Sequence, residues 1–130
     1  MARTRGESVC ERARRGHVTY QRGDVLWAVD PYRNGSNPRP WVLISNDSLP
    51  YAHSEYIALI LTTKSHPGSR RLTASDWEYG QPPRTSYISP WTVGTIKHDQ
   101  TRNVQGRLRT SVVAEVVGEL ESYIEGENTA

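Results

Sequence analysis

One arginine stands out because its setting suits the binding of a phosphate. Arg39 lies between Pro38 and Pro40, at the end of a segment rich in turn residues. A proline restricts its own backbone and that of the residue before it, so the side chain would be held in place at a reduced entropic cost. A guanidinium donates two parallel hydrogen bonds to phosphate oxygens. The same pattern also fits a turn whose arginine pairs with a surface carboxylate, and the local sequence does not decide between these interpretations.

Hydroxyl and aromatic side chains extend this chemistry. Thr62 and Thr63 follow an apolar run, where a strand could present hydroxyls at the rim of a sheet, although threonine is also simply a good strand residue. Aromatic residues beside arginines are typical of single-stranded nucleic acid binding, in which bases stack on rings. Such residues lie in or near predicted loops and strand ends: Tyr32, Trp41, Tyr51, Tyr56 and Trp91. Because the chain has no Phe, Trp and Tyr must also fill the core.

Short apolar runs predict the strands that would position these residues. Strands are expected at 25–29, 41–44 and 57–61, and the last two are apolar at nearly every position, as in central strands buried on both faces. Residues 30–40 carry Asp, Asn, Gly, Ser and three prolines, so they predict a loop that contains Arg39.

The second half predicts more short strands and one helix. Residues 64–84 indicate mainly loop, with room for a short edge strand, and separate strands are expected at 85–89 and 92–96, on either side of Pro90. Short strands with recurrent turn signals favour an all-β barrel or sandwich. Apolar residues at helical spacing over 112–124 predict a C-terminal helix, with Thr110 or Ser111 as its N-cap and Gly126 after its end.

Composition divides the chain into an arm, one domain and a tail. Residues 1–17 have almost no core-forming side chains and predict a flexible basic arm, 18–126 the folded domain, and 127–130 a C-terminal tail. The net charge is +2, whereas residues 1–16 carry five arginines and two glutamates, so the arm supplies the positive excess. Such an arm can contact nucleic acid or serve only as a solubilising extension.

Several classes of site are not expected. Cys10 is the only cysteine, which excludes a disulfide or a cysteine-based zinc site within one chain. No histidine stands at metal-ligand spacing from another, so we expect neither a metal nor a cofactor. No apolar run approaches the roughly 20 residues of a membrane helix, and the first residues lack the apolar core of a secretory signal. A cytoplasmic protein that does not enter membranes is therefore expected.

Taken together, these residues resemble the MazF/PemK/Kid family of toxin endoribonucleases. The resemblance spans roughly residues 20–124, and its order and spacing make it fairly specific. The residues that carry it are Arg22-Gly23-Asp24-Val25, Trp27, Pro31, Gly35, Arg39-Pro40, Val42-Leu43-Ile44-Ser45-Asn46-Asp47, Ile57 to Leu61 with Thr62, Ser86-Tyr87-Ile88, Thr95-Ile96, Gly106, Leu108 and the terminal helix.

The resemblance implies a fold, an activity and partners. Such proteins form a mainly β, SH3-like small barrel with a C-terminal helix, and they form homodimers. They cut single-stranded RNA, including mRNA, at short sequences without a metal, leaving a 2′,3′-cyclic phosphate and a 5′-OH, and a cognate antitoxin blocks the RNA groove. By motif position, Arg39 and Thr62 match the family's catalytic residues, with Thr63 as the alternative to Thr62. The RNA-binding residues implied are Arg22, Tyr32, Arg33, Asn37, Pro40, Asn46, Thr63, Lys64 and Trp91.

The chain departs from the family pattern where many members carry carboxylates. Asn37 stands near the place of a loop glutamate, Ser89 and Trp91 replace an Arg-x-Asp pair, and Gly94 replaces an arginine. The general base could then be Asp30, His98 or Asp99. Two other functions stay open: a CcdB-type toxin that binds gyrase through the terminal helix, and an inactive barrel that binds RNA or a protein partner.

Overall fold

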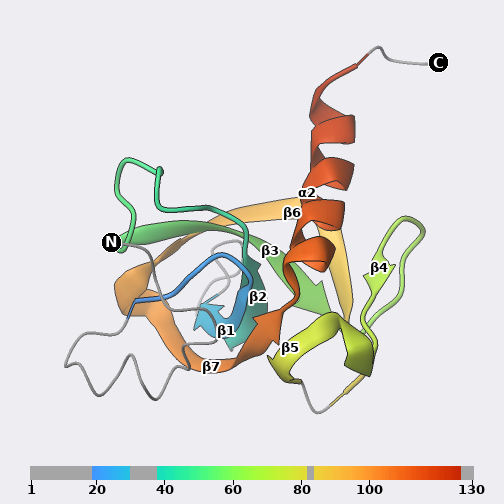
Figure 1. Cartoon of the computed structure of the whole chain (residues 1–130), viewed down its shortest axis with the longest axis horizontal. Coiled ribbons are helices and arrows are strands. Elements are labelled where there is room, and N and C mark those ends of the chain that lie inside the picture. The colour runs from blue at the N-terminus through green and yellow to red at the C-terminus, as the bar shows by residue number, and fades with distance from the viewer. Residues whose placement is uncertain (1–18, 30–37, 82–83, 127–130) are drawn as a thin grey trace.

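The computed structural model describes residues 19–29, 38–81 and 84–126, which form one curled antiparallel sheet and a C-terminal helix (Figure 1). The strand order is β4-β6-β3-β2-β1-β7-β5. The sheet closes part of the way round into a half-barrel, which confirms the predicted small β-barrel with a terminal helix. The elements are β1 Asp24–Val29, β2 Pro38–Leu43, β3 Glu55–Thr62, β4 Arg70–Arg71, η1 Ala74–Asp76, β5 Trp77–Gly80, β6 Tyr87–Lys97, η2 His98–Gln100, β7 Thr101–Leu108 and α2 Thr110–Ile124.

Strands β2 and β3 are buried on both faces, as their apolar runs predicted. Val42 pairs with Leu59, and both side chains join the cluster beneath α2. Their neighbours Trp41 and Ile60 also pair, and they join a second cluster with Leu43 and Ala58. Successive side chains of a strand point to opposite faces of the sheet. A strand that packs against an apolar cluster on each face therefore needs a continuous apolar sequence. These two strands form the rigid centre of the sheet.

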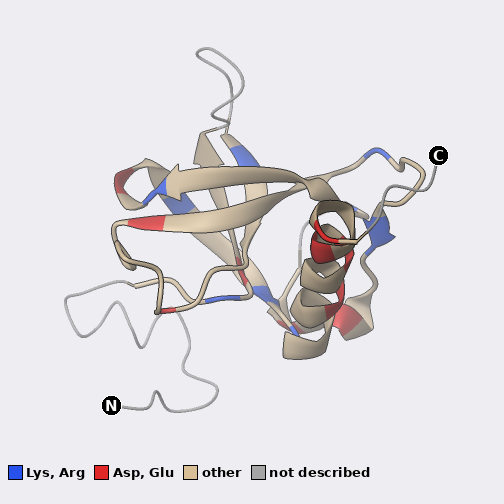
Figure 2. Ribbon diagram, turned by 90° about the horizontal axis from the view of Figure 1, so that it is seen from above, with Lys and Arg blue, Asp and Glu red and all other residues tan. Residues whose placement is uncertain are grey.

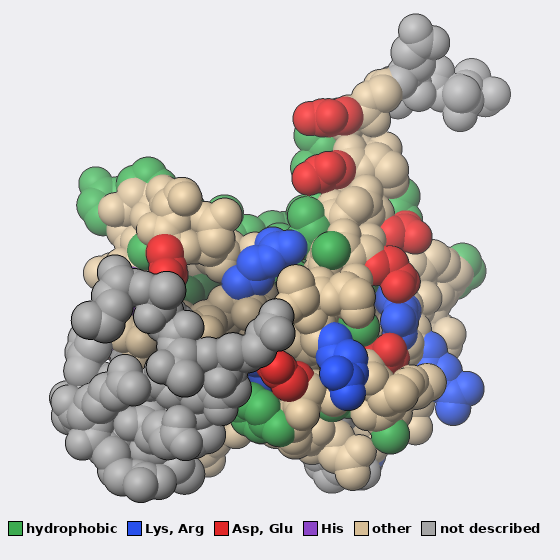
Figure 3. Space-filling model, viewed as in Figure 1, with side chains coloured by type: hydrophobic (Ala, Val, Ile, Leu, Met, Phe, Trp, Pro, Cys, Tyr) green, Lys and Arg blue, Asp and Glu red, His purple; other side chains and the backbone are tan. Residues whose placement is uncertain are grey.

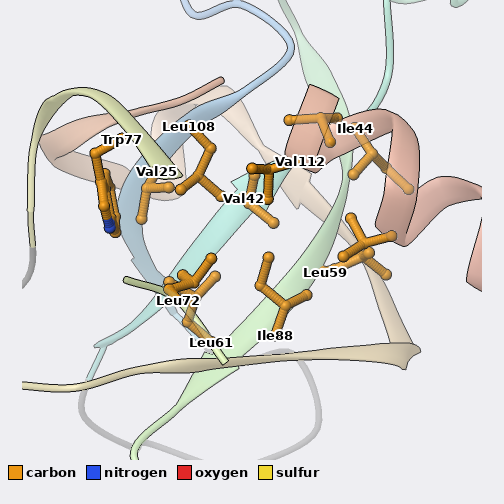
Figure 4. Packing of buried hydrophobic residues seen from close by; sticks show 12 residues of the cluster. Val25, Val42, Ile44, Leu59, Leu61, Leu72, Trp77, Ile88, Leu108 and Val112 are labelled. Carbon is orange, nitrogen blue, oxygen red and sulfur yellow. The ribbon is translucent and has the colours of Figure 1, made fainter. Parts of the chain in front are cut away.

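Helix α2 packs on the sheet through its first turns only. Val112, Val113 and Val116 are buried against core residues of β1, β2 and β3 (Figure 4). The helix then rises away from the body, and Tyr123 and Ile124 are 53% and 73% exposed (Figure 3). Gly126, at φ +92°, follows its end as predicted.

The predicted N-cap of α2 was wrong. Arg109 is the N-cap residue and makes no capping bond with its side chain. Its backbone N donates to Asp76 O, and its Nε donates to Ser75 O at 2.8 Å. Contacts with η1 therefore fix the start of the helix, and these contacts are invisible to a local capping pattern.

Strand β6 is one strand where the sequence predicted two. Leu59 pairs with Val93 and Leu61 pairs with Ile88, so the segment from Ser89 to Thr92 bulges opposite Ile60. Bulges accommodate a proline because the local ladder is already interrupted. Pro90 therefore lies inside the strand, where the sequence placed a boundary.

Strand β7 was not predicted, whereas β4 and β5, the two edge strands, lie within residues 64–84, where the sequence left room for a short edge strand. Strand β7 reads Thr-Arg-Asn-Val-Gln-Gly-Arg-Leu, which has no apolar alternation. It pairs with β1 on one side and β5 on the other, where a Cβ on Gly106 would lie 2.5 Å from Tyr79 O. The buried carboxylate of Asp24 accepts a hydrogen bond from Arg107 Nε at 2.8 Å, which ties β7 to β1. Long-range pairing, rather than local pattern, makes these strands.

Candidate functional site

Arg39 lies in strand β2, which corrects the prediction that it sits in a loop. The strand begins at Pro38, and residues 38–40 pair with β1, with Arg39 opposite Ala28. Pairing between β2 and β3 begins only at Trp41. Since the first residues of β2 are bonded on one side, prolines fit there without removing a ladder bond. The sheet, more than the prolines alone, positions the arginine.

The sheet brings Arg39 and Thr62 together. Trp41 pairs with Ile60, and the same register continued by two residues places Arg39 opposite Thr62 on the same face. Thr62 ends β3, and its Oγ1 accepts a hydrogen bond from Lys64 N at 3.2 Å. That bond fixes the hydroxyl oxygen while leaving its hydrogen available to a ligand.

Two hollows meet at this pair of residues. Arg39, Thr62 and Thr63 line both of them. The first hollow has a volume of about 320 Å³ and is also lined by Trp27, Pro38, Pro40, Leu61, Arg84, Ser86 and Gln105. The second has a volume of about 680 Å³ and is also lined by Ile60, Lys64, His66, Pro67, Ser89, Trp91 and Thr92. The bulge of β6 supplies the last three, so the irregular part of that strand forms one wall of the site.

A third hollow lies beside the first. It has a volume of about 390 Å³ and shares Arg84 and Ser86 with the first hollow. Its other lining residues are Arg71, Leu72, Thr73, Ala74, Trp77, Gln81 and Thr85. The three hollows together are called the basic groove below.

The basic groove carries cations without carboxylates. Arg39, Lys64, Arg71 and Arg84 line it, and no Asp or Glu does so among the residues that the structure describes. Low-dielectric walls lined with one sign of charge focus the field and attract ligands of the opposite sign. The groove is therefore suited to a polyanion.

A tight turn positions His66 in the second hollow. Ser69 N donates to His66 O at 2.9 Å, and Pro67 and Gly68 occupy the centre of this turn, with Gly68 at φ +89°. A proline followed by a residue with positive φ is typical of a type II turn. The turn lies against Trp91, since a Cβ on Gly68 would approach its ring to 3.3 Å. Trp91 in turn meets Tyr123 edge-on at 6.4 Å between ring centroids.

The structure gathers some of the predicted RNA-binding residues and separates others. Pro40, Thr63, Lys64 and Trp91 line the groove beside Arg39 and Thr62. Two others do not line the groove: Arg22 donates from Nη1 to Ile44 O at 2.7 Å, and Asn46 Oδ1 accepts from Ser48 N at 2.8 Å. The remaining three, together with Asp30, fall outside the described residues: Tyr32, Arg33 and Asn37.

The proposed bases His98 and Asp99 are remote from Thr62. They line a hollow with Glu55, the first residue of β3, whereas Thr62 is its last. Eight residues of strand place the two ends roughly 23 Å apart at about 3.3 Å per residue. Neither residue lies in the basic groove.

Sequence analysis missed three ionisable residues of the groove, namely His66, Arg71 and Arg84. The His-Pro-Gly-Ser turn just after the threonines was a usable signal for His66. Arg71 reaches the groove through pairing between β4 and β6, and Arg84 lies just before β6 begins at Tyr87, so no local signal exists for either arginine. Within the described part of the chain, no cluster of three or more His, Cys, Asp or Glu residues could hold a metal ion. No helix there is long and apolar enough to cross a membrane.

Comparison with known proteins gives a family and a fold. The sequence model of the PemK-like, MazF-like toxins of type II toxin–antitoxin systems matches residues 21–124. No curated protein sequence matches the chain.

Solved structures of similar fold come from several bacteria. An endoribonuclease from a mycobacterial species, in complex with its cognate antitoxin, is 20% identical with a TM-score of 0.61, covering 86% of this chain and 98% of that one. MazF in a MazE–MazF crystal from Deinococcus radiodurans is 17% identical with a TM-score of 0.65, covering 82% and 96%. Toxin MazF-mt6 of Mycobacterium tuberculosis is 16% identical with a TM-score of 0.56, covering 76% and 96%.

Proposed function

The chain belongs to the PemK-like, MazF-like family of type II toxins, and from this premise we propose that it is an endoribonuclease that cleaves single-stranded RNA at short sequences without a metal. The observation that carries the proposal is the meeting of Arg39 and Thr62 in a groove lined by cations and by no described carboxylate. Endoribonuclease is also the activity named for two of the similar mycobacterial structures. Cleavage of mRNA would stop translation and growth.

The proposed reaction is an internal transesterification. The ribose 2′-OH gives its proton to a base, its oxygen bonds to phosphorus, the bond from phosphorus to the 5′-oxygen breaks, and that oxygen takes up a proton. The products are a 2′,3′-cyclic phosphate and a 5′-OH. Arg39 would donate to the phosphate oxygens and stabilise the charge that builds on them. Thr62 would donate its hydroxyl hydrogen to a phosphate oxygen.

We assign the proton acceptor to His66. A general base works best when its pKa is near the operating pH, and among ordinary side chains histidine fits that requirement. His66 lines the hollow that contains Arg39 and Thr62 and sits on a hydrogen-bonded turn. Arginine itself is a poor base because it stays protonated.

The proposal includes partners and location. A cognate antitoxin would cover the groove, and a similar endoribonuclease has been solved in complex with its cognate antitoxin. A homodimer is expected, and light scattering of the purified protein tests it. A cytoplasmic location follows from the substrate. The arm of residues 1–17 and the tail of 127–130 lie outside the described residues, and their roles stay predictions.

The test is cleavage of a single-stranded RNA in excess EDTA. Wild-type protein should produce fragments with a 2′,3′-cyclic phosphate and a 5′-OH, read by mass spectrometry, and Arg39→Ala should produce none above background. Equal cleavage by the two proteins would show that a contaminant does the work and would overturn the proposal. Intact RNA together with capture of gyrase would favour the CcdB-type function instead, for which the exposed end of α2 offers a surface.

A further inference from the structure

The first and third hollows share a wall, and that wall is basic. Arg84 and Ser86 line both, so the basic groove runs from Arg39 past Arg84 to Arg71. We propose that Arg84 and Arg71 form a second phosphate-binding subsite, which holds the RNA backbone next to the phosphate that is cleaved. This inference rests on the proposed function and assigns a role to the part of the groove beyond Arg39 and Thr62.

The backbone around Arg84 is anchored while its side chain is exposed. Ser86, which is 4% exposed, donates from its hydroxyl to Arg84 O at 3.1 Å. Strand β6 begins one residue later, at Tyr87. The guanidinium of Arg84 makes no ion pair with any described residue. A cation on a fixed backbone without a carboxylate partner retains its charge for a ligand.

The two residues of β4 are both arginines, Arg70 and Arg71, and they differ in whether a carboxylate pairs with them. Arg70 forms two ion pairs: its Nη1 donates to Asp76 at 2.7 Å, and its Nε donates to Glu115 at 2.8 Å. Neighbouring residues of a strand point to opposite faces, so Arg71 faces away from this network and lines the third hollow. Figure 2 shows the helix carrying acidic residues beside the basic strand β4. The carboxylates on that side neutralise Arg70 and leave Arg71 without an ion pair among the described residues.

A nucleic acid backbone fits this arrangement better than a single small anion. The cations are spread over joined hollows instead of converging on one point, and hydroxyl residues lie between them, including Thr73, Thr85 and Ser86. Contacts to nucleic acid backbones come mainly from arginine, lysine and hydroxyl side chains. Trp77 adds an apolar floor to the third hollow.

The test measures binding of a non-cleavable RNA, in which 2′-deoxyribose replaces the ribose at the cleaved position. Fluorescence anisotropy gives the dissociation constant at several salt concentrations. Each phosphate contact to a single strand contributes a slope of about −0.7 to log K against log salt. Arg71→Ala with Arg84→Ala should therefore reduce the slope by about 1.4 and weaken binding by tenfold or more at low salt.

Control variants separate this subsite from general charge. Arg102 is exposed on β7 and lines none of the three hollows, so Arg102→Ala should leave the slope almost unchanged. Arg84→Lys keeps the charge and should restore most of the slope lost in Arg84→Ala. A wild-type slope in the double variant would overturn the subsite while leaving RNA cleavage by wild-type protein intact. Wild-type protein that neither binds nor cleaves RNA would overturn both proposals.

Discussion

The two ends of strand β3 carry hollows of opposite character. At the Thr62 end, the basic groove brings together Arg39, Lys64 and Arg84, without a carboxylate in its described lining. At the Glu55 end, a hollow is lined by both signs of charge, with Glu55 and Asp99 beside Lys97 and His98. The hollow at the Glu55 end has a volume of about 840 Å³, which exceeds that of any single hollow of the groove, the largest being about 680 Å³.

At the Glu55 end, ionisable groups bind one another. Lys97 Nζ bonds Glu55, which raises the pKa of Lys97. Tyr56 OH and His98 Nδ1 are 2.6 Å apart, and the Tyr20 ring lies beside the His98 ring. Interactions of this kind satisfy the groups within the protein and leave little net charge for a ligand. The candidate site therefore differs from the other hollow in having cations without carboxylates in its described lining, and neither volume nor the presence of a histidine distinguishes the two.

The largest expected effect comes from replacing a cation by a carboxylate at the Thr62 end of β3. The same exchange at the Glu55 end is its control. Arg39→Glu should lower kcat/KM for RNA cleavage by about 10³-fold or more, because a phosphate ligand is lost and a repelling charge is added. Lys97→Glu changes the charge by the same amount and should lower it less than about threefold. Cleavage of a labelled RNA in EDTA measures both, and thermal unfolding checks that both variants fold. Similar losses in the two variants would show that the overall charge, and not the groove, determines activity.

Each end of β3 also has one histidine that is a candidate for the general base: His66 at the Thr62 end and His98 at the Glu55 end. His66→Gln should lower the single-turnover rate by about 10²-fold at neutral pH and remove the rise of rate with pH that a histidine base produces. His98→Gln should leave both the rate and the pH profile close to those of wild type. The measurement is the cleavage rate from pH 5 to pH 9 at saturating protein. An unchanged pH profile of the cleavage rate in His66→Gln would exclude His66 as the base and leave Asp30 as the remaining candidate.

Sequence alone predicted the centre of the fold and the main pair of the site. The runs 41–44 and 57–61 gave β2 and β3 because strands buried on both faces need continuous apolar sequence. Arg39 and Thr62 were chosen by residue type and by resemblance, and both line the same two hollows of the folded sheet. The local sequence was sufficient to predict a strand where its apolar pattern matches the burial of that strand in the folded protein.

The rest of the site depends on contacts between distant segments. Strand β7 lacks apolar alternation and exists because β1 and β5 pair with it, and β6 continues through Pro90 because a bulge accommodates the ring. Arg84 lies near the start of β6 and Arg71 lies in the two-residue strand β4, so the folded sheet alone brings them together. The assignment of RNA contacts to Tyr32, Arg33 and Asn37 stays a prediction, since these residues lie outside the described part.

The smallest expected effect concerns the paired charges beside the groove, at Arg70, Asp76 and Glu115. Hydrogen bonds from Arg70 hold the pKa of Asp76 below its usual value, and Asp76 Oδ2 also accepts from Thr73 N at 2.7 Å. A carboxyl whose pKa is lowered in the folded state stabilises the protein above its unfolded pKa, near 3.9, and loses that contribution as the pH falls through the folded pKa. Asp76→Asn should therefore lower the free energy of unfolding by about 1 kcal/mol at pH 7, and this difference should shrink when the pH is lowered below the unfolded pKa, near 3.9, and through the lower pKa of the folded state.

Urea unfolding of wild type and variant at pH 7 and at lower pH measures the difference, with Glu121→Gln, at an exposed position of α2, as the matched control. The cleavage rate of Asp76→Asn should stay within about twofold of wild type, because a charge used to hold η1 and β4 in place is not one that contacts the phosphate. A variant that kept full stability at pH 7 but lost RNA cleavage would reverse the distinction between the paired charges that stabilise the fold and the groove charges that bind the substrate.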